Sequence, residues 1–168
     1  MTQAFNKIAD AYDNWYETPE GRAIFHAELK CLRSLYKQCP GRWIEVGIGT
    51  GRFACSLGIS MGLDPSRRML EFAAGRGIET YEADAEDLPF PENSFDGMLV
   101  AFTFCFLNNP RKVLKECRRA LRPHGCLLLG IIPADSSWGR EYFEKASRGH
   151  HIYLIAHFRT AEEIVELT

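Results

Sequence analysis

The fold of this chain is decided by the stretch IEVGIGTGRF, residues 44–53, in which an apolar run leads into three alternating glycines. The apolar run is typical of a strand, and the residues after the glycines are typical of a short helix. Gly47, Gly49 and Gly51 then fall in a tight turn where the backbone can approach a ligand closely. The dinucleotide-binding pattern G-x-G-x-x-G has its third glycine one residue later. The spacing therefore leaves open a phosphate site, a site for a different ligand, or a turn without a ligand.

Further apolar runs follow along the chain and alternate with helical segments. Runs this short, and apolar on both faces, are typical of strands in a parallel sheet that is covered by helices. The expected strands span residues 43–47, 59–64, 78–84, 95–102 and 126–132. Their alternation with helices predicts right-handed crossovers and an α/β fold with an open, doubly wound, mostly parallel sheet.

Two of the connecting helices carry end signals. In segment 64–77, Asp64 is expected as the N-cap and Pro65 as the first helical residue. Segment 109–125 carries one apolar stripe at helical spacing, and its helix is expected to end at the proline and glycine of residues 123–125.

The bulk composition predicts one ordinary globular domain. The 168 residues are enough for one hydrophobic core, and 46% of them are apolar and 25% charged. The net charge of −2 argues against nucleic acid and an anionic membrane as partners. Arg118, Arg119 and Arg122 are expected to form a solvated helix face. No run approaches the roughly 20 apolar residues that cross a bilayer, and the N-terminus lacks the apolar core of a signal peptide.

Six cysteines are scattered along the chain without a C-x-x-C pair. Zinc sites need thiolates or imidazoles at short spacings, and disulfide frameworks belong to secreted chains. We therefore expect no metal site, no disulfide framework and a cytoplasmic protein in a reducing environment.

Acidic residues follow two successive strands of the expected sheet. Asp64 ends the second strand, where a carboxylate can accept both hydroxyls of a ribose. The third strand ends at Asp84-Ala85-Glu86, where a carboxylate can accept from an exocyclic amine and a backbone amide can donate to a ring nitrogen, as adenine requires. A helix cap at Asp64 and a turn at Asp84 are the alternatives, but their joint placement at one sheet edge favours a ligand.

These features together resemble the class I S-adenosylmethionine-dependent methyltransferases. The resemblance runs from AYDNWYE (11–17) through IEVGIGTGRF, GLDPSRRML and ADAEDLPFPENSFD to the segment 107–131, which is most of the chain. It implies a seven-stranded sheet in the order 3-2-1-4-5-7-6, with the last strand antiparallel. Family members continue past FRTAEEIVELT (158–168) into a final β-hairpin. We therefore expect the order 3-2-1-4-5 with the last two strands missing, in a truncated chain or in a short form that covers its sheet edge by self-association.

The resemblance also implies the cofactor, S-adenosylmethionine, with S-adenosylhomocysteine as its product. The glycines would line the methionine half with Glu45 near its ammonium group, Asp64 would hold the ribose, and Asp84 would accept from the adenine amine. Phe102 and its neighbour would flank the sulfonium, and Tyr12 would close over the cofactor as part of a lid, unless the N-terminal aromatic residues only pack on the core. The residues that the resemblance places at the cofactor are Tyr12, Glu45, Gly47, Gly49, Gly51, Asp64, Pro65, Met69, Asp84, Ala85, Glu86, Phe102 and Thr103.

The implied organisation is a single domain over residues 1–168. Residues 1–40 would form a helical lid, 41–132 the cofactor-binding core, and 133–168 a substrate-side segment with the start of the last helix. In that last segment Trp138 and Tyr142 are expected to form an aromatic wall.

The implied reaction is an in-line methyl transfer to a small-molecule acceptor. Such a reaction needs alignment and exclusion of water, so no catalytic residue is expected, and His150 and His151 are expected to have a surface or packing role. A monomer or homodimer is expected. The alternative function is a cofactor-binding protein without transferase activity, or a partner subunit of a methyltransferase; an NAD-dependent oxidoreductase is disfavoured by the glycine spacing.

Overall fold

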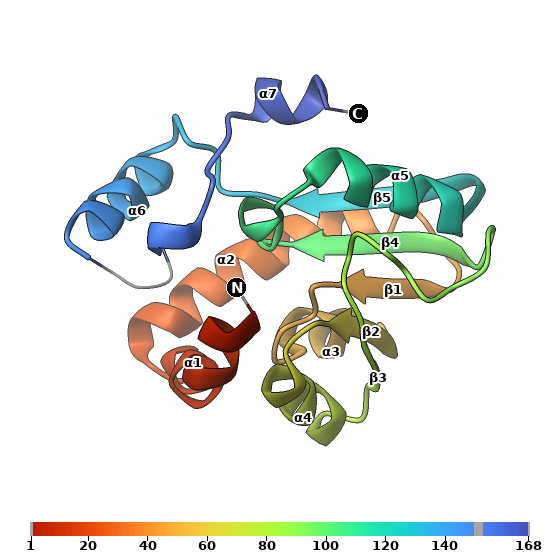
Figure 1. The fold of residues 1–168 in the computed structure, drawn as a ribbon. Helices are drawn as coiled ribbons and strands as arrows, with labels where there is room; N and C mark the ends of the chain where they lie inside the picture. Colours follow the sequence, from red (N-terminus) through yellow and green to blue (C-terminus); the bar gives the residue numbers. More distant parts are fainter. Residues whose placement is uncertain (1, 150–152, 168) are drawn as a thin grey trace.

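The structure is a computed structural model, and it describes residues 2–149 and 153–167. A five-stranded parallel sheet with the order β3-β2-β1-β4-β5 forms its centre (Figure 1). The predicted α/β class and strand order are therefore confirmed. The strands are β1 (Trp43–Val46), β2 (Met61–Asp64), β3 (Glu79–Glu82), β4 (Phe95–Ala101) and β5 (Leu121–Gly130).

Helices cover both faces of the sheet, and the alternation of side chains along the central strands separates two cores. On one face, Ile44 and Val100 belong to a cluster with residues of α5; on the other, Trp43 and Leu99 belong to a cluster with residues of α2, α3 and α4. None of the helices within the described residues is long and apolar enough to span a membrane. The helices are α1 (Thr2–Trp15), α2 (Pro19–Tyr36), α3 (Arg52–Leu57), α4 (Arg67–Gly75), α5 (Pro110–Ala120), α6 (Ser137–Ser147) and α7 (Ala161–Val165), with short 3-10 helices η1 (Phe104–Phe106) and η2 (Tyr153–Ile155).

The N-cap expected for α4 was wrong. The cap is Ser66, whose hydroxyl oxygen accepts from the Met69 amide at 3.3 Å, and the helix begins at Arg67. Asp64 is the last residue of β2, and its carboxylate accepts from the amides of Gly49 and Ser66. It cannot cap α4 because it is held by the glycine loop.

The end expected for α5 was also wrong. The helix ends at Ala120, and residues 123–125 lie inside β5. The Ser94 amide donates to the Ala120 carbonyl, and Phe95 pairs with Leu121, so the chain enters the sheet directly from the helix. Arg122 therefore lies on the strand, where it forms an ion pair with Asp96 at 2.7 Å instead of belonging to a helix face.

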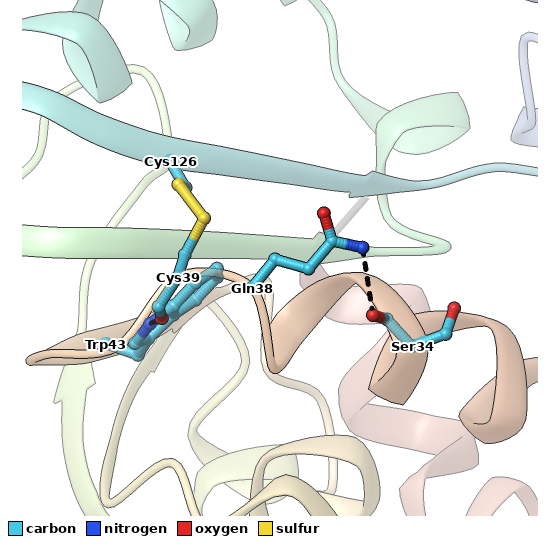
Figure 2. Close-up of a disulfide and its surroundings, with 5 residues drawn as sticks. All are labelled: Ser34, Gln38, Cys39, Trp43 and Cys126. Carbon is cyan, nitrogen blue, oxygen red and sulfur yellow. Dashed lines mark hydrogen bonds between the residues drawn. A yellow bond between two sulfur atoms is a disulfide. The ribbon is translucent and has the colours of Figure 1, made fainter.

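A disulfide joins Cys39, just after α2, to Cys126 in β5, 87 residues away (Figure 2). The Trp43 indole donates to the Cys39 carbonyl at 2.8 Å and fixes the chain beside the bond. The expectation that the scattered cysteines lack disulfide chemistry was therefore wrong, because the pairing depends on the packing of α2 against β5 and not on sequence spacing. Because disulfides are rare in reducing compartments, the cysteines no longer support a reducing environment for this protein. Its cytoplasmic localisation remains a prediction.

Candidate functional site

A cavity of about 670 Å³ lies at the carboxyl ends of the strands. In Figure 1 the arrowheads of β1, β4 and β5 point toward the side where α1, α2 and α6 lie, and residues of these helices contribute to its wall. All of the residues predicted for the cofactor except Gly51 line this cavity: Tyr12, Glu45, Gly47, Gly49, Asp64, Pro65, Met69, Asp84, Ala85, Glu86, Phe102 and Thr103.

The three glycines after β1 all have positive φ, at 72°, 53° and 80°, but for different reasons. A Cβ on Gly49 would meet no atom within 4 Å, so this position faces open space in the cavity wall. A Cβ on Gly47 would lie 2.3 Å from Thr103 Cγ2, and one on Gly51 would lie 2.8 Å from Ile78 Cδ1. Gly51 is the N-cap of α3 and allows close packing against α4 and the residues before β3. The structure does not bring it to the cavity.

Glu45 is a buried carboxylate in the cavity wall, with 1% of its surface exposed. Its Oε2 atom has no hydrogen-bond partner among the described residues. Burial raises the pKa of this carboxyl well above its ordinary value, against a hydrogen bond from the Ala54 backbone that lowers it, and the nearby Asp64 raises it further. A buried polar atom without a partner is costly, and a cationic ligand group in the cavity would remove that cost.

Asp64 joins the glycine loop to the start of α4. Its carboxylate is 9% exposed and accepts from the Gly49 amide at 3.0 Å and from the Ser66 amide at 2.8 Å. Burial raises the pKa of Asp64, and the two backbone hydrogen bonds oppose that shift. Because α4 starts beside it, Asp64 both shapes the loop and presents a carboxylate to the cavity.

The acidic segment after β3 forms a second turn at the same edge. The Asp84 carboxylate accepts from the Glu86 amide at 2.9 Å, and the Glu86 carboxylate accepts from the Asn109 amide at 3.0 Å. Ala85 between them is buried. The segment is thereby tied to the start of α5 and is fixed before any ligand binds.

The segment after β4 is tied to the glycine loop and to β5. The Thr103 hydroxyl donates to the Gly47 carbonyl at 2.9 Å, and the Phe102 amide donates to the Gly130 carbonyl at 2.8 Å. Phe102 has a φ of 55°, which is unusual for a residue with a side chain. Its ring centroid lies 5.3 Å from that of Phe53. The backbone thus turns sharply to place this ring in the cavity wall.

Helix α1 is anchored over the site by Asp13, a residue that the sequence reasoning missed. Asp13 is buried, and its carboxylate accepts hydrogen bonds of 2.9 Å from Arg52 and from Arg76. Arg52 begins α3 directly after the glycine loop, and Arg76 follows α4. The sequence does place this acid directly after the expected lid tyrosine, Tyr12. Its two arginine partners, however, are 39 and 63 residues away and could not be identified from the sequence.

The other end of the cavity is lined by aromatic residues from α1, α6 and η2. The Tyr12 and Tyr16 hydroxyls lie 3.1 Å apart, and burial raises the pKa of Tyr12 to about 12. Tyr142 belongs to this wall as expected, whereas Trp138 is exposed and outside it. The sequence reasoning missed Glu28 and Tyr153, which also line the cavity. His150 and His151, for which a surface or packing role is expected, lie outside the described residues.

No group of three or more His, Cys, Asp or Glu residues that could hold a metal ion occurs within residues 2–149 and 153–167. The polar groups of the cavity wall include carboxylates, backbone groups and the hydroxyls of tyrosine and threonine side chains. This set suits a ligand with positive charge, hydroxyl groups and an amine.

Residues 44–129 match the family described as a methyltransferase domain, which is about half of the chain. An uncharacterized protein of Mycobacterium tuberculosis is 41% identical over 166 residues, which cover 99% of this chain and 58% of that protein. This chain therefore spans little more than half the length of that relative. A demethylmenaquinone methyltransferase of Thermotoga maritima is 39% identical over 142 residues, covering 79% of this chain and 62% of the enzyme.

A crystal structure from Thermotoga maritima is similar over 99% of this chain and 77% of that protein, with a TM-score of 0.91 and 36% identity. It is described as an S-adenosylmethionine-dependent methyltransferase, possible histamine N-methyltransferase. The similarity extends over the helices α1 and α2 as well as the sheet, since nearly the whole chain is covered.

Proposed function

Because this chain belongs to the class I S-adenosylmethionine-dependent methyltransferases, we propose that it transfers a methyl group from S-adenosylmethionine to a small-molecule acceptor. The observation that carries the proposal is the buried Glu45 carboxylate, which has an unpaired oxygen among the described residues and belongs to the cavity wall next to the glycine loop. An oxygen in that position is suited to the methionine ammonium group. A pyrophosphate would be repelled by it.

The residues of the wall fit the remaining parts of the cofactor. Gly49 leaves open space where a ligand can approach the backbone. Asp64 offers a carboxylate suited to ribose hydroxyls, and Asp84 with the adjacent Ala85 backbone suits an adenine edge. S-adenosylmethionine supplies an activated methyl group on a positively charged sulfur, so carboxylates around the site also match its charge.

The chain's own contribution to the reaction is alignment and exclusion of water. The acceptor atom attacks the methyl carbon in line with the departing sulfur, so no covalent catalyst is required from the protein. Phe102 and Thr103 are held beside the glycine loop by hydrogen bonds and would border the reacting atoms. Helix α1, anchored through Asp13, would cover the site with Tyr12. Positioning of this kind supplies several kcal/mol of the barrier reduction.

A small acceptor is supported by the size of the cavity. Its volume of about 670 Å³ falls within the range of small-ligand pockets, and part of it would be filled by the cofactor. Two similar proteins are described by small acceptors, demethylmenaquinone and, as a possibility, histamine. We further propose that the protein acts as a monomer or homodimer in the cytoplasm, without nucleic acid or membrane as a partner.

The test is transfer of label from S-adenosylmethionine with a labelled methyl group to a panel of primary amines, phenols and thiols. The wild-type protein should methylate at least one of them, and Gly49→Val should not. Cofactor affinity is measured in parallel by calorimetry. Binding without transfer to any acceptor would favour a cofactor-binding protein or a partner subunit, and absence of binding would contradict both readings.

A further inference from the structure

The cavity contains one acidic side chain that the cofactor does not account for, Glu28 on α2. It belongs to α2, whereas Glu45 and Asp64 belong to the strands β1 and β2. Burial raises the pKa of Tyr12, Tyr16 and Tyr142, and the negative charge of Glu28 raises it further at each of them, so the carboxylate lies within electrostatic reach of rings from both α1 and α6.

The rings around Glu28 are held in place by contacts with each other. The Tyr12 and Tyr16 rings meet edge to face with centroids 5.4 Å apart. Tyr142 stacks on Tyr153 with centroids 4.5 Å apart and an angle of 13° between the planes. Faces of tyrosine rings attract cations. This part of the cavity therefore combines a carboxylate with aromatic side chains.

Within the described residues, the Glu28 carboxylate forms no hydrogen bond and no ion pair. Two cations already face rings of this group. The Lys145 Nζ atom lies 5.3 Å from the Tyr142 ring centroid and is paired with Glu141 at 2.8 Å, and the Arg52 guanidinium lies 5.2 Å from the Tyr16 ring centroid and is paired with Asp13. Burial raises the pKa of Glu28 to about 7. The free protein thus keeps a partly buried acid that is poorly stabilised as an anion.

We propose that Glu28 is a specificity-determining residue that receives the protonated amino group of the methyl acceptor inside the tyrosine-walled end of the cavity. The acceptor is then a small organic amine, and its cation is held by one carboxylate and by ring faces. This assignment rests on the proposed methyl transfer. Glu28 acts in recognition, and no proton transfer by it is required.

The experiment compares matched amine and alcohol probes. Binding of phenethylamine and 2-phenylethanol, and of hexylamine and hexanol, is measured by calorimetry at pH 7.5 with saturating S-adenosylhomocysteine. In the wild-type protein, at least one amine should bind about tenfold or more tightly than its alcohol, the size expected for one charge-assisted hydrogen bond. Glu28→Gln should remove that preference while leaving the affinity for S-adenosylhomocysteine unchanged.

Glu20→Gln is the matched control, since it changes an exposed carboxylate of the same helix that does not line the cavity, and it should keep the preference. Thermal unfolding at pH 8 provides a second readout: Glu28→Gln should raise the midpoint if the carboxylate is kept unpaired for a ligand, and a lowered midpoint would indicate a structural role and overturn the proposal. A wild-type protein without preference for any amine, or a Glu28→Gln variant that retains it, would also overturn the proposal. A wild-type protein that does not bind S-adenosylhomocysteine would instead refute the proposed function.

Discussion

Replacing Asp13 by alanine tests whether α1 is held over the cofactor cavity by its ion pairs. The Asp13 carboxylate accepts from Arg52 and Arg76, and both arginines flank the segments that build the cavity wall. Without this carboxylate, the two guanidinium groups would face each other across the gap that it leaves. We expect α1 to loosen and the affinity for the cofactor to fall.

The magnitude follows from the burial of the three side chains. The side chains of Asp13, Arg52 and Arg76 are 11%, 15% and 23% exposed. Removing one partner from a fully buried ion pair costs about 3–5 kcal/mol. Because both arginines retain access to water, we expect a loss of about 2–3 kcal/mol in the free energy of unfolding. For a domain of this size that corresponds to a decrease of roughly 4–12 °C in Tm.

The assay is urea unfolding of the free protein combined with calorimetric binding of S-adenosylhomocysteine. The matched control is Asp10→Ala. Asp10 lies on α1 as Asp13 does, and its ion pair with Arg68 of α4 joins two side chains that are well exposed. The control should change stability little, since exposed pairs contribute little. If Asp13→Ala unfolds at the wild-type urea concentration and binds with wild-type affinity, the anchoring role is refuted.

The pH dependence gives an independent check on Asp13. Burial alone would raise its pKa, but hydrogen bonds with Arg52, Thr50 and Arg76 outweigh burial and hold the pKa below its ordinary value of 3.8. A carboxyl group with a lowered pKa stabilises the fold fully above its ordinary pKa, and that contribution is lost as the pH falls through the lowered value. The difference in stability between wild type and Asp13→Ala should therefore be constant from about pH 5 to 8 and shrink below about pH 4.

Four further predictions concern the cavity and the disulfide. Asp64→Ala should weaken binding of S-adenosylhomocysteine by about tenfold or more, because it removes an acceptor for the ribose together with the tie to the glycine loop; unchanged calorimetric affinity in a folded variant would remove Asp64 from the site. Gly49→Val should abolish binding while circular dichroism shows a folded protein, since the side chain would fill open space in the cavity and adds strain at a positive φ; wild-type binding would show that the loop is only a turn. Burial raises the folded-state pKa of Glu28 from 4.5 to about 7, so this carboxyl group stabilises the fold at low pH and that stabilisation is lost as the pH rises through about 7. The Tm of a Glu28→Gln variant should therefore decline less than that of the wild type between about pH 5 and 8. Identical Tm profiles would contradict the raised pKa. Breaking the bond between Cys39 and Cys126 with a reductant should lower Tm, because the cross-link closes a long loop, and the Cys126→Ala variant should match the reduced protein; equal Tm values in oxidised and reduced wild type would show that the bond contributes nothing.

The sequence by itself determined the sheet and the position of its ligand edge. Short apolar runs at the spacing of an α/β fold predicted five strands of a mostly parallel sheet, and the resemblance to the class I methyltransferases implied the order that the structure has. The glycine loop, Asp64 and Asp84 could be placed at one edge because the carboxyl ends of parallel strands meet there. These features depend on local periodicity and on the order of elements along the chain, both of which can be read directly from the residues.

Helix ends were less predictable, because two neighbouring residues can compete for one role. Aspartate and serine are both favourable N-cap residues, so Asp64 and Ser66 were both candidates. Ser66 caps α4, whereas the Asp64 carboxylate accepts a hydrogen bond from the Gly49 amide, 15 residues away. The end of α5 was likewise decided by pairing of Leu121 with Phe95 in the sheet. In each case a contact from another element outweighed the local preference.

Contacts between residues far apart in the chain could not be predicted from the sequence. The anchoring of Asp13 by Arg52 and Arg76, the packing role of Gly51 and the disulfide between distant cysteines each need residues that lie far apart in the chain. In the sequence, Glu28 is one acid among several on an amphipathic helix. Only the fold shows that it shares a cavity wall with tyrosines of α1 and α6. Burial and pairing are properties of the folded surroundings, and neither a side chain's type nor its spacing in the sequence specifies them.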